Sequence, residues 1–124
     1  MIKYYSNHNT DCLRACISSI IKVDLKDFPN LDKYWFSDLY NYIYKKGFNI
    51  SHCRAIDNNI TLNYYIAVYK NPWEDLQYHA VVCKNNKIIH NPSINDKFDY
   101  TSINPDYFIL INKIKKLIIQ SKQS

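Results

Sequence analysis

Three side chains of this sequence have the chemistry of a nucleophilic catalytic site: the thiol of Cys12, the imidazole of His79 and the carboxamide of Asn91. A thiolate attacks carbonyl carbon, an imidazole carries protons, and an amide or carboxylate can hold that imidazole in one tautomer. The three residues are far apart in the sequence. The elements around them must therefore bring them together if they act as one site.

Cys12 lies where a polar segment meets an amphipathic helix. Residues 9–11 have short polar side chains that can cap the first turn, and Cys12 falls inside that turn. The positive end of the helix dipole favours a thiolate there. The alternative is a cysteine that belongs to the core of a buried helix. Apolar residues repeat at helical spacing at Leu13, Cys16, Ile17, Ile20 and Ile21.

His79 and Asn91 lie on the two arms of a predicted β-hairpin. Residues 78–84 and 87–91 flank Asn85-Asn86, and asparagine tolerates the left-handed conformation that a two-residue hairpin turn needs. Pairing of the arms places His79 close to Asn91 at the open end of the hairpin. Taken singly, His79 fits a strand histidine bonded to a backbone carbonyl, and Asn91-Pro92 fits a turn. The joint pattern with Cys12 favours a catalytic set.

The remaining elements predict one α+β domain over residues 1–124, because two helices are followed by strands. We expect helices over 11–22 and from 30–32 to 46, with Gly47 as a C-terminal cap, and a short helical turn within 23–29. A turn is expected at 57–59, a loop over 93–105 and a frayed tail over 120–124. The expected strands, besides the hairpin, are 48–56, 62–69 and 107–111.

Composition excludes several classes of protein. The chain of 124 residues carries a formal charge of +5, but the basic residues are scattered lysines, with arginine only at Arg14 and Arg54, so we expect no nucleic-acid partner. A single glycine excludes Gly-rich phosphate loops. No signal peptide or membrane-spanning run is recognisable, so we expect a cytoplasmic protein without a membrane partner.

The four cysteines are expected to be reduced thiols. A Cys12–Cys16 disulfide along one helix would be badly strained. A zinc site built from Cys12, Cys16, His8, His52 and Cys53 is an alternative, but no second ligand pair has the spacing of a known zinc motif. We therefore expect neither a metal nor a cofactor.

Three short motifs resemble papain-like cysteine peptidases, most closely the bacteriocin-processing (double-glycine leader) peptidase domains. Residues 11–17, Asp-Cys-Leu-Arg-Ala-Cys-Ile, are similar to the family's Asp-Cys-Gly-x-Ala-Cys-Leu segment. Residues 79–82, His-Ala-Val-Val, resemble its histidine strand, and residues 88–93, Ile-Ile-His-Asn-Pro-Ser, resemble its strand that ends in Asp-Pro. The resemblance covers about residues 6–93. It implies a papain-like fold, with a nucleophile helix packed on a small antiparallel sheet.

The resemblance also implies roles: Cys12 as nucleophile, His79 as general base and acid, and Asn91 as the orienting residue. This chain departs from the family twice. Ser6 stands where the family has a glutamine that donates to the oxyanion, and Leu13 replaces the glycine after the nucleophile. Candidates for oxyanion or substrate contacts are Asn7, Asn9, Trp73 and Tyr78.

We therefore expect a papain-like thiol hydrolase, of cysteine peptidase or isopeptidase type, that cleaves an amide or related acyl bond of a peptide or protein. The two departures keep a second hypothesis open, a non-catalytic module of the same fold that binds a peptide or protein. The third hypothesis is an acyltransferase or amidotransferase with the same triad and an amine acceptor.

Overall fold

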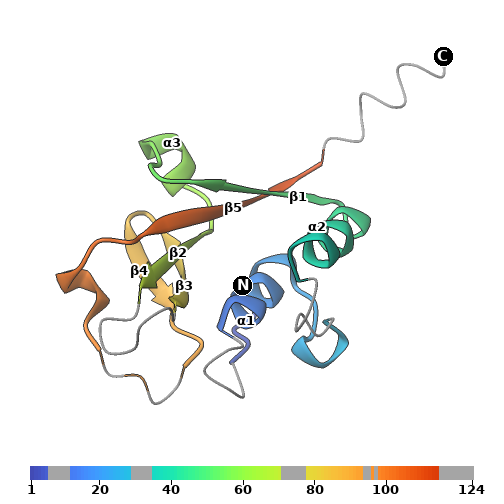
Figure 1. The fold of residues 1–124 in the computed structure, drawn as a ribbon, viewed down its shortest axis with the longest axis horizontal. Helices are drawn as coiled ribbons and strands as arrows, with labels where there is room; N and C mark the ends of the chain where they lie inside the picture. Colours follow the sequence, from blue (N-terminus) through green and yellow to red (C-terminus); the bar gives the residue numbers. More distant parts are fainter. Residues whose placement is uncertain (6–11, 29–34, 71–77, 94–95, 97, 115–124) are drawn as a thin grey trace.

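The computed structural model describes residues 1–5, 12–28, 35–70, 78–93, 96 and 98–114 (Figure 1). These residues form an α+β structure, as expected from the sequence. The helical elements are α1 Cys12–Ile21, the 3₁₀ helix η2 Leu25–Asp27, α2 Trp35–Lys45, α3 Asn58–Thr61 and the 3₁₀ helix η3 Tyr100–Ser102. The strands are β1 Phe48–Cys53, β2 Tyr65–Lys70, β3 Tyr78–Lys84, β4 Lys87–His90 and β5 Tyr107–Lys113.

The strands form one antiparallel sheet in the order β1-β5-β2-β3-β4. Alternate residues of β3 face opposite sides of this sheet. Ala80 and Val82 join the core cluster that includes α1 and α2, which Figure 1 shows on the same side of the sheet. Val81 and Cys83 join a second cluster with Tyr100 of η3. The sheet is therefore covered by two helices on one face and by an irregular segment on the other.

Helix α1 is amphipathic and ends in a left-handed residue. Cys16, Ile17 and Ile21 of the predicted stripe are buried, whereas Leu13 and Ile20 are only half-buried. Lys22 has φ 62°, and the N–H of Val23 donates to the carbonyl of Ser18 at 3.1 Å. This 6→1 bond is the Schellman arrangement that ends a helix. The predicted cap residues 9–11 lie outside the described residues.

Helix α2 ends as the sequence predicts. Gly47 has φ 92°, and its N–H donates to the carbonyl of Tyr44 at 2.9 Å. Leu39 and Ile43 are its buried residues. Residues 30–32, where the sequence predicts its start, lie outside the described part, and the helix as described begins at Trp35.

The hairpin of β3 and β4 is confirmed. Asn85 and Asn86 have φ of 55° and 62°, the two left-handed residues of a type I′ turn. Strand β4 ends at His90, one residue before the predicted end. The β3–β4 ladder has a register shift between Val82 and Cys83.

Two strand boundaries were predicted wrongly around residues 57–64. The expected turn at 57–59 is the start of α3, because the Asp57 carboxylate accepts the N–H of Ile60 at 2.9 Å and caps the helix. Strand β1 ends at Cys53, where its pairing with β5 ends, and β2 starts at Tyr65, after α3. Leu62, predicted in the strand, is the C-cap of α3 and is 61% exposed.

Strand β5 is longer than predicted. It continues to Lys113 because β1 pairs with it from Phe108 to Lys113. The short helical turn predicted within 23–29 is confirmed as η2, and it is tied to α1 by Arg14, whose guanidinium donates to the carbonyls of Leu25 and Phe28 at 2.8 Å each. Among the described helices, none is long and apolar enough to cross a membrane. The predicted tail over 120–124 lies outside the described residues.

Candidate active site

Cys12 is the first residue of α1 and is buried against β3. Its Sγ lies 3.8 Å from the carbonyl oxygen of Tyr78, the residue before His79. One turn later, Sγ of Cys16 lies 3.3 Å from the carbonyl oxygen of Ala80. The β3–β4 ladder runs only from Val82 to Lys84, so these two carbonyls lie beyond it. The two thiols of α1 therefore approach the part of β3 that carries His79.

His79 and Asn91 are in direct contact, as the hairpin predicts. His79 Nε2 lies 2.8 Å from Asn91 Oδ1, which also accepts the backbone N–H of Ser93 at 3.0 Å. The Ser93 donor requires an oxygen at this position, which defines the orientation of the amide. Because that oxygen only accepts, Nε2 of the neutral imidazole must carry its proton, and Nδ1 is left unprotonated. Nδ1 is then the nitrogen that can act as a base.

The environment of His79 keeps its imidazole neutral near pH 7. The residue is 7% exposed, and burial lowers the pKa of His79 below its ordinary value of 6.5. The hydrogen bond to Asn91 and the charge of Asp96 offset part of this effect by favouring the protonated form. A neutral imidazole is the form that a general base requires before it accepts a proton.

Two further residues contact His79, and neither was foreseen from the sequence. Asp96 Oδ2 lies 3.4 Å from His79 Nε2. The ring of Tyr100 stacks on the imidazole with a centroid separation of 4.9 Å and an interplanar angle of 22°. Both residues fall in the segment predicted as a loop over 93–105. One sequence feature could have indicated Asp96 as a neighbour of His79. It is an acidic residue shortly after Asn91, in the segment that leaves the open end of the hairpin.

Cys12 lies in the same electrostatic environment as Tyr100. Burial is the main cause that raises the pKa of Tyr100, with the nearby Asp96 carboxylate next, and a charge on Cys12 adds to these effects. Cys12 acts in the same direction on the pKa of Tyr107, which burial mainly raises. Because side chains alternate along β3, the His79 side chain lies on the Tyr100 side of the sheet. Helix α1 packs on the opposite side, near the edge of the sheet.

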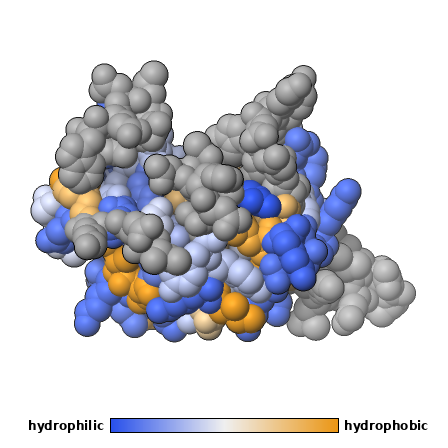
Figure 2. Space-filling model, turned by 90° about the horizontal axis from the view of Figure 1, so that it is seen from below, coloured by the Kyte–Doolittle hydropathy of each residue, from blue (hydrophilic) through white to orange (hydrophobic). Residues whose placement is uncertain are grey.

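The other predicted site residues are only partly described. Tyr78 is 46% exposed, and its ring centroid lies 6.1 Å from that of Tyr107, so it is available as a wall of a substrate site. Asn7, Asn9 and Trp73 lie outside the described residues. On the face in Figure 2, hydrophobic residues of the described part form separate orange patches between hydrophilic ones.

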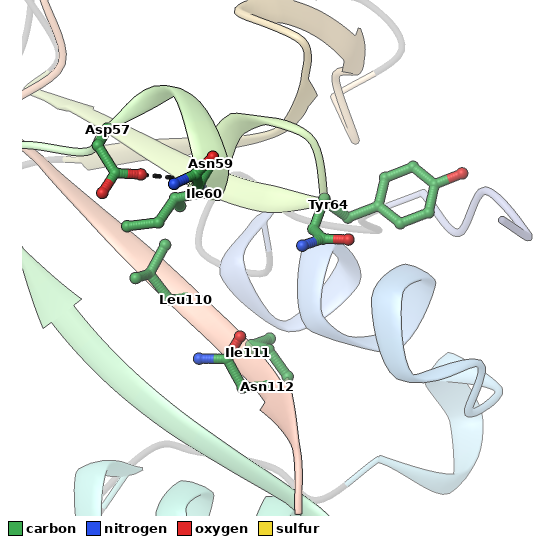
Figure 3. Close-up of a pocket in the computed structure, with 8 residues that line it drawn as sticks. Asp57, Asn59, Ile60, Tyr64, Leu110, Ile111 and Asn112 are labelled. Atoms are coloured by element: carbon green, nitrogen blue, oxygen red, sulfur yellow. Dashed lines mark hydrogen bonds between the residues drawn. The ribbon is translucent and has the colours of Figure 1, made fainter.

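A pocket of about 290 Å³ lies elsewhere, between α3 and β5. Figure 3 shows Ile60 of α3 and Leu110 of β5 on facing walls, with the amide of Asn112 further along β5. Its lining includes none of the predicted site residues. In the described part of the chain, no group of three or more His, Cys, Asp or Glu side chains is arranged to hold a metal ion.

The described geometry thus joins His79, Asn91, Asp96 and Tyr100 by direct contacts and brings Cys12 to the peptide group that precedes His79. Comparison of the chain with protein-family models, curated proteins and solved structures finds no match.

Proposed function

We propose that this protein is a papain-like thiol hydrolase that cleaves an amide or related acyl bond of a peptide or protein. Cys12 is the nucleophile, His79 the general base and acid, and Asn91 the residue that orients the imidazole. The observation that carries the proposal is the 2.8 Å contact between His79 Nε2 and Asn91 Oδ1, on a strand whose Tyr78 carbonyl is approached by Cys12. A cysteine thiol and a histidine of defined tautomer are the two groups that thiol hydrolysis needs.

The reaction follows from these roles. His79 Nδ1 accepts the thiol proton of Cys12, and the thiolate adds to the carbonyl carbon of the substrate. The tetrahedral adduct collapses when the imidazolium gives its proton to the leaving amine or thiol. Water then loses a proton to His79, attacks the thioester of the acyl-enzyme, and releases the carboxylic acid and the free thiol.

One observation favours a second candidate, a non-catalytic binding module. Cys12 and Cys16 approach two carbonyls of β3, those of Tyr78 and Ala80, which is a structural use of two protonated thiols. In such a module Cys12 would help to anchor α1 and would not be activated. Its thiol would then react with alkylating agents no faster than an ordinary cysteine.

A thiol-reactive acyl probe at neutral pH tests the proposal. Mass spectrometry of the wild-type protein should locate the label on Cys12, and Cys12→Ala should abolish labelling. Cys53→Ala is a matched control, because Cys53 lies on β1 and is more exposed than Cys12. A label on Cys53 or Cys83, or persistent labelling of Cys12→Ala, would show that the assignment is wrong. Product analysis with and without added amines separates hydrolysis from acyl transfer.

A further inference from the structure

Two side chains that the mechanism above does not use support the imidazole of His79 from the segment after the hairpin. Asp96 Oδ2 accepts the hydroxyl of Tyr100 at 2.5 Å and lies 3.4 Å from His79 Nε2. Tyr100 in turn stacks its ring on the imidazole. The histidine is therefore in contact with a carboxylate and with the aromatic ring that holds this carboxylate.

This arrangement is anchored by its neighbours. The second oxygen of Asp96 accepts the backbone N–H of Phe98 at 3.1 Å. Phe98 contacts Tyr100 edge to face at 4.9 Å, and Tyr69, the β2 partner of His79, lies 5.0 Å from the Tyr100 ring. Because Tyr100 is packed from several sides, its hydroxyl and the bound carboxylate have little freedom to move away from His79.

Asp96 brings a negative charge to this cluster. Burial would raise the pKa of Asp96, but hydrogen bonds from Tyr100, Phe98 and Asn91, together with the nearby His79, hold it below the usual value. Asn91 is neutral and cannot balance a charge. Among the residues that the structure describes, the titratable groups around the imidazole are Asp96 and Tyr100 on its own face, Tyr69 on the adjacent strand, and Cys12 at the Tyr78 carbonyl.

We infer that Asp96 and Tyr100 are positioning residues, which hold the ring of His79 and stabilise its protonated form. Asn91 defines the tautomer, Asp96 supplies the charge that favours the imidazolium, and Tyr100 keeps Asp96 in place and shields the ring from water. Their catalytic importance rests on the function proposed for Cys12 and His79. Their effect on the imidazole can be measured without any turnover.

An NMR titration of the His79 ring tests this inference directly. In Asp96→Asn the pKa of His79 should fall, because the carboxylate 3.4 Å from Nε2 is removed and the imidazolium loses its nearest negative charge. Tyr100→Phe keeps the stacked ring but frees the carboxylate, so a smaller fall in the same direction is expected. Asp96→Glu should restore part of the wild-type value.

Asp99→Asn is the matched control. Asp99 lies in the same segment and caps η3 through the N–H of Thr101, so its loss should leave the pKa of His79 unchanged. If Asp96→Asn and Tyr100→Phe alter that pKa no more than Asp99→Asn does, the inference is overturned. If either Asp96→Asn or Tyr100→Phe fails to fold, the titration of the other variant still tests the inference.

Kinetics then separate this inference from the proposed function. With an acyl substrate, the acid limb of the kcat/KM profile should move to lower pH in Asp96→Asn, since that limb reports the base of the free enzyme. If Cys12 is labelled but the pKa of His79 is the same in Asp96→Asn and Tyr100→Phe as in the wild type, only the role of Asp96 and Tyr100 is overturned. A changed titration in a protein whose Cys12 is never acylated overturns the proposed function, and with it the catalytic role of this pair.

Discussion

Sγ of Cys16 lies 3.3 Å from the carbonyl oxygen of Ala80, one helical turn beyond the contact of Cys12 with Tyr78. The two cysteines approach the same strand, but their environments differ. Cys16 has no exposed surface, and burial, with a smaller effect of the neighbouring Cys12, raises the pKa of Cys16 well above its ordinary value. Cys16 is therefore an inert core thiol, whereas Cys12 lies at the helix start, against the carbonyl of the residue before His79.

Cys16→Ala should separate these roles. It removes a buried sulfur and its contact with the Ala80 carbonyl, so the free energy of unfolding should fall by about 1–3 kcal/mol. The rate at which a thiol probe modifies Cys12 should stay close to the wild-type rate, because Cys16 has no exposed surface and takes no part in the proposed reaction. Urea unfolding and labelling followed by mass spectrometry measure the two effects. Loss of labelling in a folded Cys16→Ala protein contradicts this assignment.

Asn91→Ala should impair acylation of Cys12 without unfolding the protein. It removes the acceptor of His79 Nε2, so the imidazole can adopt the wrong tautomer. A lost hydrogen bond of about 1.4 kcal/mol corresponds to a roughly tenfold slower reaction. Stopped-flow acylation with an ester substrate gives the rate.

Asn86→Gly is the matched control for Asn91→Ala, because it alters the other end of the same hairpin. Asn86 has φ 62°, a conformation that glycine adopts without strain. Its acylation rate should equal that of the wild type. Equal rates for Asn91→Ala and Asn86→Gly would mean that Asn91 does not orient the base.

The hairpin was predictable because its information is local. Asn85-Asn86 specifies the turn, and the turn defines which residues of β3 and β4 meet. The turn predicts Asn91 as a near neighbour of His79, although a register shift between Val82 and Cys83 changes which residues lie opposite each other beyond that point. Asp96 and Tyr100 were missed because contacts made from irregular segments follow no periodicity, so only the folded chain reveals them.

The error at residues 57–64 has a different cause. Apolar and aromatic composition favoured a strand from Leu62, yet the capping carboxylate of Asp57 starts a helix that ends at Leu62. A cap of this kind contributes about 1 kcal/mol, which exceeds the weak strand preference of an exposed leucine. The capping residue was therefore the better guide to structure than the run of apolar residues.

The stability of the protein should fall as the pH drops below about 6.5, the ordinary pKa of histidine. Burial lowers the pKa of His79 and of His90; His90 Nε2 lies 2.6 Å from the Tyr4 carbonyl. Below that pH the unfolded chain binds protons that the folded chain does not, so the unfolded state is favoured. The free energy of unfolding continues to fall with decreasing pH until the pH is below the lowered pKa values that the two histidines have in the folded state.

Urea midpoints measured between pH 8 and pH 5 should therefore decrease toward acid. His90→Gln should flatten part of this dependence without affecting acylation of Cys12, because His90 contacts the N-terminal segment and not the candidate site. Midpoints that do not change over this range would contradict the buried, neutral state of both histidines.

The ends of α1 and α2 offer a paired test of the left-handed caps. Gly47 has φ 92° and no atom within 4 Å of an added Cβ, so Gly47→Ala carries only a conformational cost of about 1–2 kcal/mol. Lys22 occupies the equivalent cap of α1 with φ 62°, and Lys22→Gly should stabilise the protein by up to about 1 kcal/mol. Chemical denaturation of both variants gives the two changes. Opposite signs are expected because one substitution introduces a side chain into a left-handed backbone and the other removes it, and changes of the same sign would rule out this account of the two caps.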